Sequence, residues 1–478
     1  MKKLKRKTVK ERAQNSFFYK SLKALILFLV IGGGVIAYLW WAPKLSSIVA
    51  TLSKWGVNRA LSSIGTPPQQ DEFGNINFLI AGYGGEQHQG WMLADSIMLA
   101  SYNPAQQTVT FISIPRDVYV EYPWWWGGRI NALFASAYYR SGKDINYAAK
   151  VLMDKVAKIT WVEPHYYALI SFKGFVDFID YIWGVDVELD RPFVDPKYPT
   201  PSGWYTTFSL PAGKVHLDWE TALKFARSRH STSDFSRALR QQLLIQKVFE
   251  KIKSDKSYLN PSKIKELWGE FNKMVTTNMS LNEMLGFLRY KDKIKHFFSF
   301  VLNAECERDI FENLIPGCMM YFPPREDFGW AAIILPAGAT ASNPEFYKNV
   351  KDFVFNITHN VGFLKENAKI RVLNGIDKKL VRKEYGYLKP MARPTAFLLK
   401  NNGFNIVGVA NSPQVLSGTT AVIVGSWDFR ATLDNLRLFL PLSNVVNLYQ
   451  DPYAFSWLSG DLVSDADIVL ILGNDFIR

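Results

Sequence analysis

The chain is organised around residues 218–242, which read DWETALKFARSRHSTSDFSRALRQQ. Arg227 and Arg229 are two residues apart, so on one continuous helix their side chains would point about 200° apart. They point the same way only where the backbone is extended. We therefore predict that one helix ends near Ala226 and that the two arginines follow it on extended backbone.

A second helix is predicted to follow, capped at its start by Ser233 or Asp234, whose side chains favour that position. Within it Arg237 and Gln241 are four residues apart and share one face. Arginine presents a planar fork of N–H donors that matches phosphate oxygens. The stretch therefore predicts a polyphosphate-binding site, although a run of basic residues more often forms a solvated helix face.

The composition describes a folded protein with most of its charge in one tail. With 478 residues, 48% hydrophobic and 21% charged, the chain is long enough for two or more globular units. The net charge is +13, and the first 23 residues contain nine lysines and arginines against one glutamate. The body is therefore not charged as a general nucleic-acid binder, and we expect no nucleic-acid partner.

Residues 24–42 are nineteen consecutive residues without a charge, close to the length that spans a bilayer. The basic tail 1–23 precedes them, so the positive-inside rule places the N-terminus in the cytoplasm and the rest of the chain outside. We predict a single-pass transmembrane helix followed by a stalk and linker over 43–71. A cleaved signal peptide is the alternative, although no small-residue cleavage site is evident.

Strands and helices alternate after the linker, which predicts an α/β layered domain over 72–362. The predicted strands are 76–81, 95–102, 108–114, 165–170, 184–189, 297–302 and 331–335. The predicted helices are 129–139, 145–159, 171–181, the two of the opening stretch, 261–275, one after 280–283, and 344–356. The segment before Gly213 is loop or hairpin.

A boundary near 362–367 separates a smaller α/β domain over 368–478. Its predicted strands are IRVLN, NIVGVA, TAVIVG, NVVNLY and DIVLIL, and its predicted helices lie around 394–400 and 428–438. The two cysteines of the chain, Cys306 and Cys318, are either a disulfide, as in exported proteins, or two buried thiols. The sequence leaves these two states open.

Three further positions carry chemistry that suits an anion or a cation. Asp95 begins an apolar strand, where it is either a structural cap or a metal ligand. Arg116 follows a strand end after Pro115, where a surface ion pair is the simpler interpretation. Arg129 begins a helix, and a helix start with an arginine is suited to bind an anion.

Taken together, five segments resemble the LytR–CpsA–Psr family in content and order. They are DSIMLASYN, ISIPRDVYV, GRINALFASAYY, FKGFVDFIDYIWGVDVEL and HLDWETALKFARSRHSTSDFSRALRQQ. The segments IRVLNG, GFNIVGVA and DIVLILGND resemble the domain called the LytR C-terminal domain.

The resemblance implies an α-β-α layered domain with a central mixed sheet. It also implies a membrane-anchored phosphotransferase that moves a glycan phosphate from a polyprenyl-pyrophosphate carrier to peptidoglycan. The polyprenyl tail would lie in an apolar groove, and the pyrophosphate would meet an arginine cluster with Mg²⁺ or Mn²⁺. The alternatives are a hydrolase of polyprenyl or nucleotide pyrophosphates, and a non-catalytic wall-binding or regulatory membrane protein.

The resemblance also implies roles for individual residues. Asp95 resembles the family's magnesium-side aspartate and is the predicted metal ligand. The implied pyrophosphate-binding positions are Arg116, Arg129, Arg227, Arg229, Arg237 and Gln241, with Arg129 standing where the family commonly has lysine. The predicted catalytic residues are Asp95, Arg116, Arg227 and Arg229.

Two departures from the family pattern bear on the metal. Leu93 stands where many members have arginine, and Gly82-Tyr83-Gly84-Gly85 stands where many have a second acidic residue. Glu86 is the nearest acidic substitute. Asp117 and Asp234 are candidates for the base that takes the acceptor proton, although orienting arginines or capping a helix is the favoured role.

Overall fold

A computed structural model of the chain describes residues 65–477 except 86–91, 125–126, 201–203, 230–233, 255–260, 291, 305, 307–313, 388 and 390. The predicted basic tail, transmembrane helix and most of the stalk therefore lie outside the described residues, as does Glu86. None of the described helices is both long and apolar enough to cross a membrane.

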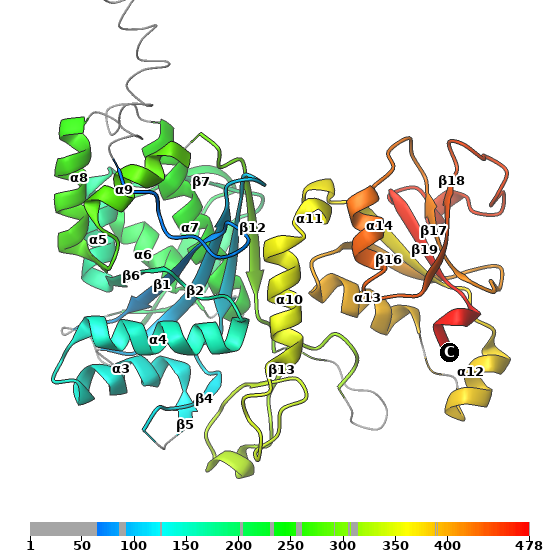
Figure 1. Cartoon of the computed structure of the whole chain (residues 1–478), viewed down its shortest axis with the longest axis horizontal. Helices are drawn as coiled ribbons and strands as arrows, with labels where there is room; N and C mark the ends of the chain where they lie inside the picture. Colours follow the sequence, from blue (N-terminus) through cyan, green and yellow to red (C-terminus); the bar gives the residue numbers. More distant parts are fainter. Residues whose placement is uncertain are drawn as a thin grey trace, which may run out of the picture. The chain divides into compact units, whose positions relative to one another are not determined.

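A six-stranded sheet forms the centre of the larger α/β region (Figure 1). Its strands, in order across the sheet, are β11 (Val275–Thr277), β6 (Tyr166–Ser171), β1 (Ile76–Tyr83), β2 (Ala94–Asn103), β3 (Thr108–Ile114) and β12 (His296–Val301). The β6–β1 and β3–β12 pairs are parallel, and the other three neighbouring pairs are antiparallel. The predicted central mixed sheet is confirmed.

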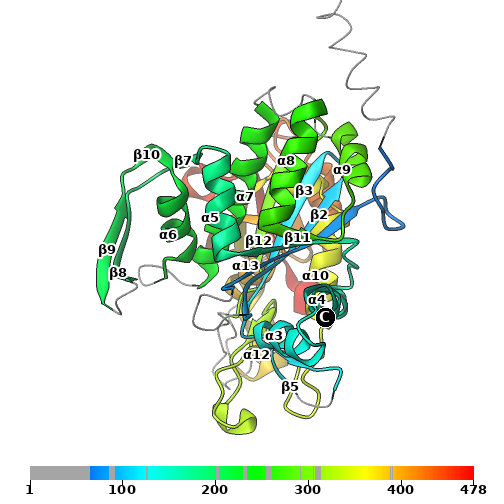
Figure 2. The same cartoon turned by 90° about the vertical axis from the view of Figure 1, so that its left-hand side faces the viewer.

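Helices cover both faces of this sheet (Figures 1 and 2). One face packs against α3 (Ile130–Arg140), α4 (Ile145–Thr160) and α10 (Lys348–His359). The other face is covered by α5 (Phe172–Tyr181), α7 (Asp234–Ser254) and α8 (Pro261–Met274). The arrangement is the predicted α-β-α layering.

Local sequence explains where the helices of these layers begin. The side chain of Asp144 accepts hydrogen bonds from the amides of Asn146 and Tyr147 at the start of α4. The side chain of Ser171 accepts one from the amide of Gly174 at the start of α5. A Cβ on Gly174 would lie 2.1 Å from the Met274 carbonyl oxygen, so the glycine permits α5 and the end of α8 to approach closely.

The remaining strands form short pairs outside the sheet. They are β4 (Tyr119–Glu121) with β5 (Gly127–Arg129), β7 (Val185–Leu189) with β10 (Gly213–Leu217), β8 (Phe193–Pro199) with β9 (Tyr205–Leu210), and β13 (Met320–Tyr321) with β14 (Leu335–Pro336). The segment before Gly213 is thus a hairpin. The short α6 (Trp219–Arg227) and α9 (Leu281–Phe287) complete this part of the chain.

Some predicted elements are wrong. Only Leu335 of the predicted strand 331–335 is in a strand, and α10 begins at Lys348 rather than at 344. Glu345 explains the shift, because its buried carboxylate accepts a hydrogen bond from Lys155 at 2.6 Å and another from Lys158, which hold this residue in a turn before the helix. The short strand β11 was not predicted.

The C-terminal residues form a second sheet of five strands. In order these are β16 (Asn405–Asn411), β15 (Lys369–Asn374), β19 (Ile468–Leu472), β17 (Thr419–Ile423) and β18 (Leu442–Asn447). The helices here are α11 (Gly362–Glu366), at the predicted boundary, α12 (Lys378–Tyr385), α13 (Ala392–Asn401) and α14 (Arg430–Leu436). The five predicted strands are confirmed, α12 was not predicted, and the likeness to the LytR C-terminal domain stays a prediction, as do the domain limits.

Both cysteines of the chain take part in one disulfide. Cys306 and Cys318 are bonded, with their Cα atoms 5.5 Å apart. The structure therefore favours the disulfide over the two buried thiols that the sequence left open.

Candidate functional site

The opening stretch of the sequence forms two separate helices. Helix α6 ends at Arg227, and Ser228 is extended with ψ 135°. Helix α7 begins at Asp234, while Ser233 lies outside the described residues. The predicted break is confirmed, with α6 ending one residue later than expected, so that Arg229 lies on the extended segment.

Side chains of α7 stabilise the end of α6 at this break. Arg240 Nε donates to the carbonyl oxygen of Phe225 at 2.9 Å, and Gln241 Nε2 donates to that of Ala226 at 3.1 Å. Arg240 also donates to the carbonyl oxygen of Ser228. The last carbonyl groups of a helix have no hydrogen-bond donor within the helix. Here α7 supplies these donors, so α6 can end at this point without unsatisfied carbonyl groups.

Asp95, at the start of β2, is the centre of one group of site residues. Arg116 Nη1 is 2.7 Å from Asp95 Oδ1, and Asn131 Nδ2, on α3, is 3.3 Å from the same oxygen. Arg237 Nη2, on α7, donates to the Asp95 carbonyl oxygen at 3.5 Å. The side chains of Arg116 and Asp95 are 25% and 37% exposed, so a ligand can reach them.

Asp117 connects Arg116 to Arg129. Its Oδ2 is 3.6 Å from Arg116 Nε, and its Oδ1 is 3.4 Å from Arg129 Nε. Arg129 Nε also donates to the carbonyl oxygen of Ala332 at 3.0 Å. A carboxylate held between two guanidinium groups orients them, which agrees with the favoured role for Asp117.

Gln241 connects the Asp95 group to the arginines at the end of α6. Ser96 Oγ donates to Gln241 Oε1 at 2.8 Å, and Ser96 is the neighbour of Asp95. The Gln241 amide nitrogen donates to Ala226, the neighbour of Arg227. Gln241 therefore joins β2, α6 and α7, a linking role that the sequence did not predict for it.

Arg227 and Arg229 contact the β8–β9 hairpin. The Arg227 guanidinium lies 4.8 Å from the centre of the Phe172 ring, and the Arg229 amide donates to Asp195 Oδ2 at 3.1 Å. Burial raises the pKa of Tyr198, while the charge of Arg227 and its hydrogen bond with the tyrosine side chain act to lower it. Arg116, Arg129 and Arg237 thus lie around Asp95 and Asp117. The Arg227–Arg229 pair lies beside the hairpin.

An apolar row leads along the sheet toward Ser96, the neighbour of Asp95. Leu79 and Ala81 of β1 belong to the core beneath α3 and α4, so Phe78 and Ile80 point to the opposite face. There Phe78 and Ile80 are half-buried, as is Ala168, which pairs with Ile80 from β6. The next residue on this face of β1 is Gly82, which pairs with Ser96. The row therefore ends at Ser96, whose side chain is bonded to Gln241 of α7.

The donors that could hold a divalent cation are few. The part of the chain that the structure describes contains no group of three or more histidine, cysteine, aspartate or glutamate side chains that could hold a metal ion. Mg²⁺ is often bound by one or two carboxylates together with substrate phosphates and water. The carboxylate of Asp95, beside the arginines, fits that kind of site.

Asn131, Ser96, Asp195 and Arg240 are site neighbours that the sequence did not identify. Ser96, Asn131 and Arg240 lie inside the quoted family segments, so their place in those segments could have indicated that they belong to the site. Asp195 lies in the hairpin segment, where no local pattern points to the arginines.

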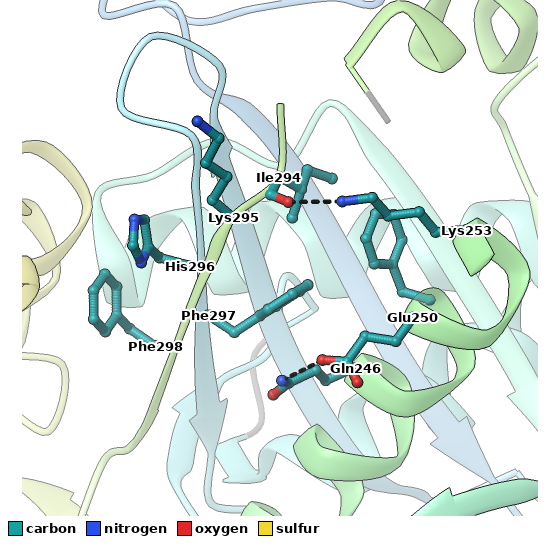
Figure 3. Close-up of a pocket in the computed structure, with 9 residues that line it drawn as sticks. Gln246, Glu250, Lys253, Ile294, Lys295, His296, Phe297 and Phe298 are labelled. Carbon is teal, nitrogen blue, oxygen red and sulfur yellow. Dashed lines mark hydrogen bonds between the residues drawn. The ribbon is translucent and has the colours of Figure 1, made fainter. Parts of the chain in front are cut away.

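A separate hollow of about 340 Å³ lies between the C-terminal half of α7 and β12 (Figure 3). Lys253 Nζ donates to the Ile294 carbonyl oxygen at 3.1 Å, and Gln246 Nε2 donates to Glu250 at 2.7 Å, as Figure 3 shows. None of the predicted site residues lines this hollow. We assign it no role in the site.

Comparison with known proteins identifies the family. The LytR_cpsA_psr family model matches residues 53–326, which is more than half of the chain. The chain therefore belongs to this family, as the sequence predicts.

Two named relatives are similar to this chain over part of its length. The polyisoprenyl-teichoic acid–peptidoglycan teichoic acid transferase TagU of Bacillus mycoides is 28% identical over 307 residues, 61% of this chain and 85% of that protein. TagV of Bacillus subtilis, which bears the same transferase name, is 28% identical over 197 residues, 40% of this chain and 46% of that protein.

The crystal structure of B. subtilis TagV has a TM-score of 0.41 at 21% identity, covering 59% of this chain and 97% of that one. A structure described as TagT bound to LI-WTA also has a TM-score of 0.41, at 19% identity, covering 60% and 93%. Both TM-scores are below 0.5, so the assignment rests on the sequence matches. Those matches confirm the prediction of an enzyme of this transferase family.

Proposed function

We propose that this enzyme transfers a phosphate-linked glycan from a polyprenyl-pyrophosphate carrier to peptidoglycan. The observation that carries the proposal is the set of contacts that brings Arg116, Asn131 and Arg237 to Asp95. The relatives named as polyisoprenyl-teichoic acid–peptidoglycan transferases support the substrate class.

The site suits a pyrophosphate for electrostatic reasons. A pyrophosphate is highly charged, and phosphoryl transfer depends mainly on positioning and on neutralising the oxygens that gain charge. Arg116 and Arg129 are already oriented by Asp117, and Arg227 is oriented by Phe172 and Tyr198. Preoriented guanidinium groups do not have to reorganise when the charge develops.

The apolar row on β1 and β6 suits the lipid part of the carrier. Phe78, Ile80 and Ala168 are half-buried on the sheet face that leads to Ser96 and Asp95. A polyprenyl chain lying on this row would bury apolar surface and place its pyrophosphate at the polar group. The aromatic and aliphatic side chains would thus select a lipid-linked substrate over a free nucleotide.

In the transfer, the oxygen of an acceptor hydroxyl bonds to the phosphorus that carries the glycan. The bond from that phosphorus to the bridging oxygen breaks, and polyprenyl phosphate leaves with the negative charge that the arginines stabilise. The hydroxyl proton passes to solvent or to a phosphate oxygen, since Asp117 is engaged with Arg116 and Arg129. Mg²⁺ or Mn²⁺ held by Asp95 would supply additional positive charge next to the phosphates.

The proposed location is the outer side of the cell membrane. The uncharged stretch 24–42 and the basic tail before it would anchor the chain, with the N-terminus in the cytoplasm and the enzyme facing the wall. Protease protection of an N-terminal tag in intact cells, together with cleavage of a C-terminal tag, is the expected result. Cleavage of both tags would contradict this topology.

The decisive experiment compares transfer of a lipid-linked glycan to peptidoglycan by wild type and Arg116→Ala. Removing one preoriented charge from the transition state is expected to lower kcat/KM by about 10²-fold to 10³-fold. Arg437→Ala is the matched control, because Arg437 forms a surface ion pair with Asp434. Equal transfer by wild type and Arg116→Ala would refute the assignment, and release of only free glycan phosphate in the presence of peptidoglycan would indicate a hydrolase.

A further inference from the structure

Strand β8 presents three side chains to the junction of α6 and α7. The pairing of β8 with β9 shifts register between Asp195 and Tyr198, as at a β-bulge, where one extra residue changes which side chains share a face. As a result Tyr198, and not the exposed Lys197, is buried on the same side as Asp195. Phe193 completes the set, and Figure 2 shows this hairpin next to α6.

Asp195 fixes the backbone at Arg229. Its side chain is fully buried, and its two oxygens accept hydrogen bonds from different segments. Oδ1 accepts from the amide of Lys197 at 3.1 Å, within its own strand, and Oδ2 accepts from the amide of Arg229 at 3.1 Å. A buried carboxylate is costly unless it is bonded in this way, so the loss of either bond would disturb the contact.

Arg240 fixes the same segment from the other side. It is 8% exposed, lies 4.9 Å from the centre of the Phe193 ring, and donates to the carbonyl oxygens of Phe225 and Ser228. Burial lowers the pKa of the Arg240 guanidinium to about 10, and the negative charge of Asp195 opposes this shift. Arg240 is therefore charged at neutral pH and spans the last turn of α6.

These contacts enclose the end of α6, which carries Arg227, and the two residues that follow it, Ser228 and Arg229. The carbonyl of Ser228 is held by Arg240, and the amide of the next residue, Arg229, is held by Asp195. Arg227, just before them, is held by the Phe172 ring and by Tyr198. The peptide between Ser228 and Arg229 is thus fixed at both its polar groups.

We propose that Asp195 and Arg240 are positioning residues that hold the Ser228–Arg229 peptide so that Arg227 and Arg229 are presented together to the ligand. Neither residue needs to touch the substrate. The identity of the ligand as a pyrophosphate rests on the proposed function, whereas the positioning rests on the contacts of the hairpin and of α7.

The first test is Asp195→Asn in the full-length protein. Asparagine has nearly the same shape but offers one oxygen and one NH₂ group, so it cannot accept from both amides. Hydrogen exchange of the Arg229 amide is expected to become about tenfold faster, since a bond to a charged acceptor is lost. The affinity for inorganic pyrophosphate with Mg²⁺, measured by calorimetry, is expected to fall about tenfold for the same reason.

Val187→Ala is the matched control for a general loss of stability. Val187, on β7, is 2% exposed and belongs to the same apolar cluster as Tyr198 and Phe225. Its truncation lowers the melting temperature through lost packing and is expected to leave both readouts unchanged. Equal losses in Val187→Ala and Asp195→Asn would show a merely structural role and would overturn the proposal.

Arg240→Lys tests whether the fork of Arg240 is needed. Lysine keeps the positive charge but is a single point donor that cannot reproduce the two bonds to Phe225 and Ser228. The pyrophosphate affinity of this variant is expected to fall as it does in Asp195→Asn. Wild-type affinity in Arg240→Lys would overturn the role of Arg240.

Different results would contradict the proposed function and the proposed positioning role. Unchanged exchange at Arg229 in Asp195→Asn overturns the positioning, whatever the ligand. Faster exchange in that variant, in a protein whose wild-type form does not bind pyrophosphate, supports the positioning and contradicts the pyrophosphate as ligand.

Discussion

Asp117 shows how a carboxylate in the candidate site can act by orienting its neighbours. It lies between the guanidinium groups of Arg116 and Arg129, at 3.6 and 3.4 Å from their Nε atoms. Each of its two carboxylate oxygens thus faces a different guanidinium group. Orientation of the arginines is the function that this geometry supports.

Asp117→Asn is therefore expected to lower kcat/KM by no more than about tenfold, whereas removal of a general base costs about 10²-fold to 10⁴-fold. The pH–rate profile of glycan transfer should keep its shape, because no titrating base is lost. Asp177→Asn, which alters an exposed ion pair with Lys173, is the control. Disappearance of the acidic limb of the profile would instead identify Asp117 as the base.

Glu345 is a buried acid whose ionisation affects the stability of the folded protein. Burial raises its pKa, but hydrogen bonds from Lys155 and Lys158 outweigh burial, so that the pKa lies below the ordinary value of 4.5. A lowered pKa in the folded state stabilises the protein above pH 4.5, and this contribution is lost as the pH falls through the folded value.

Glu345→Gln is accordingly expected to reduce the free energy of unfolding by about 2 kcal/mol at neutral pH, as for hydrogen bonds to a charged group. The difference from wild type should shrink as the pH falls below 4.5. Urea unfolding at several pH values measures it, with Glu270→Gln, in a surface ion pair with Lys273, as control. A difference that is independent of pH would contradict the lowered pKa.

At the scale of elements, Gln242 joins two strands to the helix that carries it. Its Nε2 donates to Ser113 Oγ of β3 at 2.9 Å and to the Phe300 carbonyl oxygen of β12 at 2.8 Å. The side chain is fully buried, next in sequence to Gln241. Helix α7 is thus fixed to the sheet where it also contacts β2.

Gln242→Leu is expected to lower the free energy of unfolding by about 1–3 kcal/mol, because buried polar partners lose their donor. Chemical unfolding in urea is the measurement. Gln246→Leu, one turn further along α7 and partly exposed, should change the midpoint much less. An unchanged midpoint in Gln242→Leu would show that the two contacts contribute little.

Several elements were predictable because their signals are local. The spacing of Arg227 and Arg229 predicted the helix break, and the apolar stretch 76–81 predicted β1. The start of α10 was not predictable, since Glu345 is held by lysines of α4 that are distant in sequence. Helix α12 was missed because its residues, KKLVRKEY, include five charged side chains and only three apolar ones, too few to indicate a buried face.

The arginines of the candidate site were predictable from the sequence. The residues that hold them in place were not. The family segments identified Asp95 and Arg116, which do lie together. Asp195 was not identified, because its contact with Arg229 depends on a register shift in a hairpin. Such a contact depends on tertiary structure and leaves no pattern along the chain.

At the scale of the whole molecule, a buried amide pair joins α10 to the C-terminal sheet region. Asn356 of α10 and Asn435 of α14 exchange two hydrogen bonds, at 3.0 and 2.8 Å, and both side chains are buried. Glu366 adds bonds to the amides of Ala431 and Thr432 at 3.0 and 2.7 Å. These contacts couple the folding of the two regions.

Asn356→Ala and Asn435→Ala are each expected to lower the free energy of unfolding by about 1–3 kcal/mol, because each leaves one buried amide without its partner. The double variant should lose less than the sum, which gives a coupling energy of about 1 kcal/mol or more. Urea unfolding of all four proteins measures it. Additive losses would show that the two amides do not depend on each other.

The parallel pairing of β12 with β3 has a consequence for how the protein acquires its structure. Residues 108–114 pair with β2 early, but they meet their parallel partner β12 only after every element from α3 to α9 has been synthesised. Contacts between such distant segments slow folding, and until they form the edge of β3 is an open template for other chains. We therefore expect mutations that weaken β12 to reduce yield before they reduce activity.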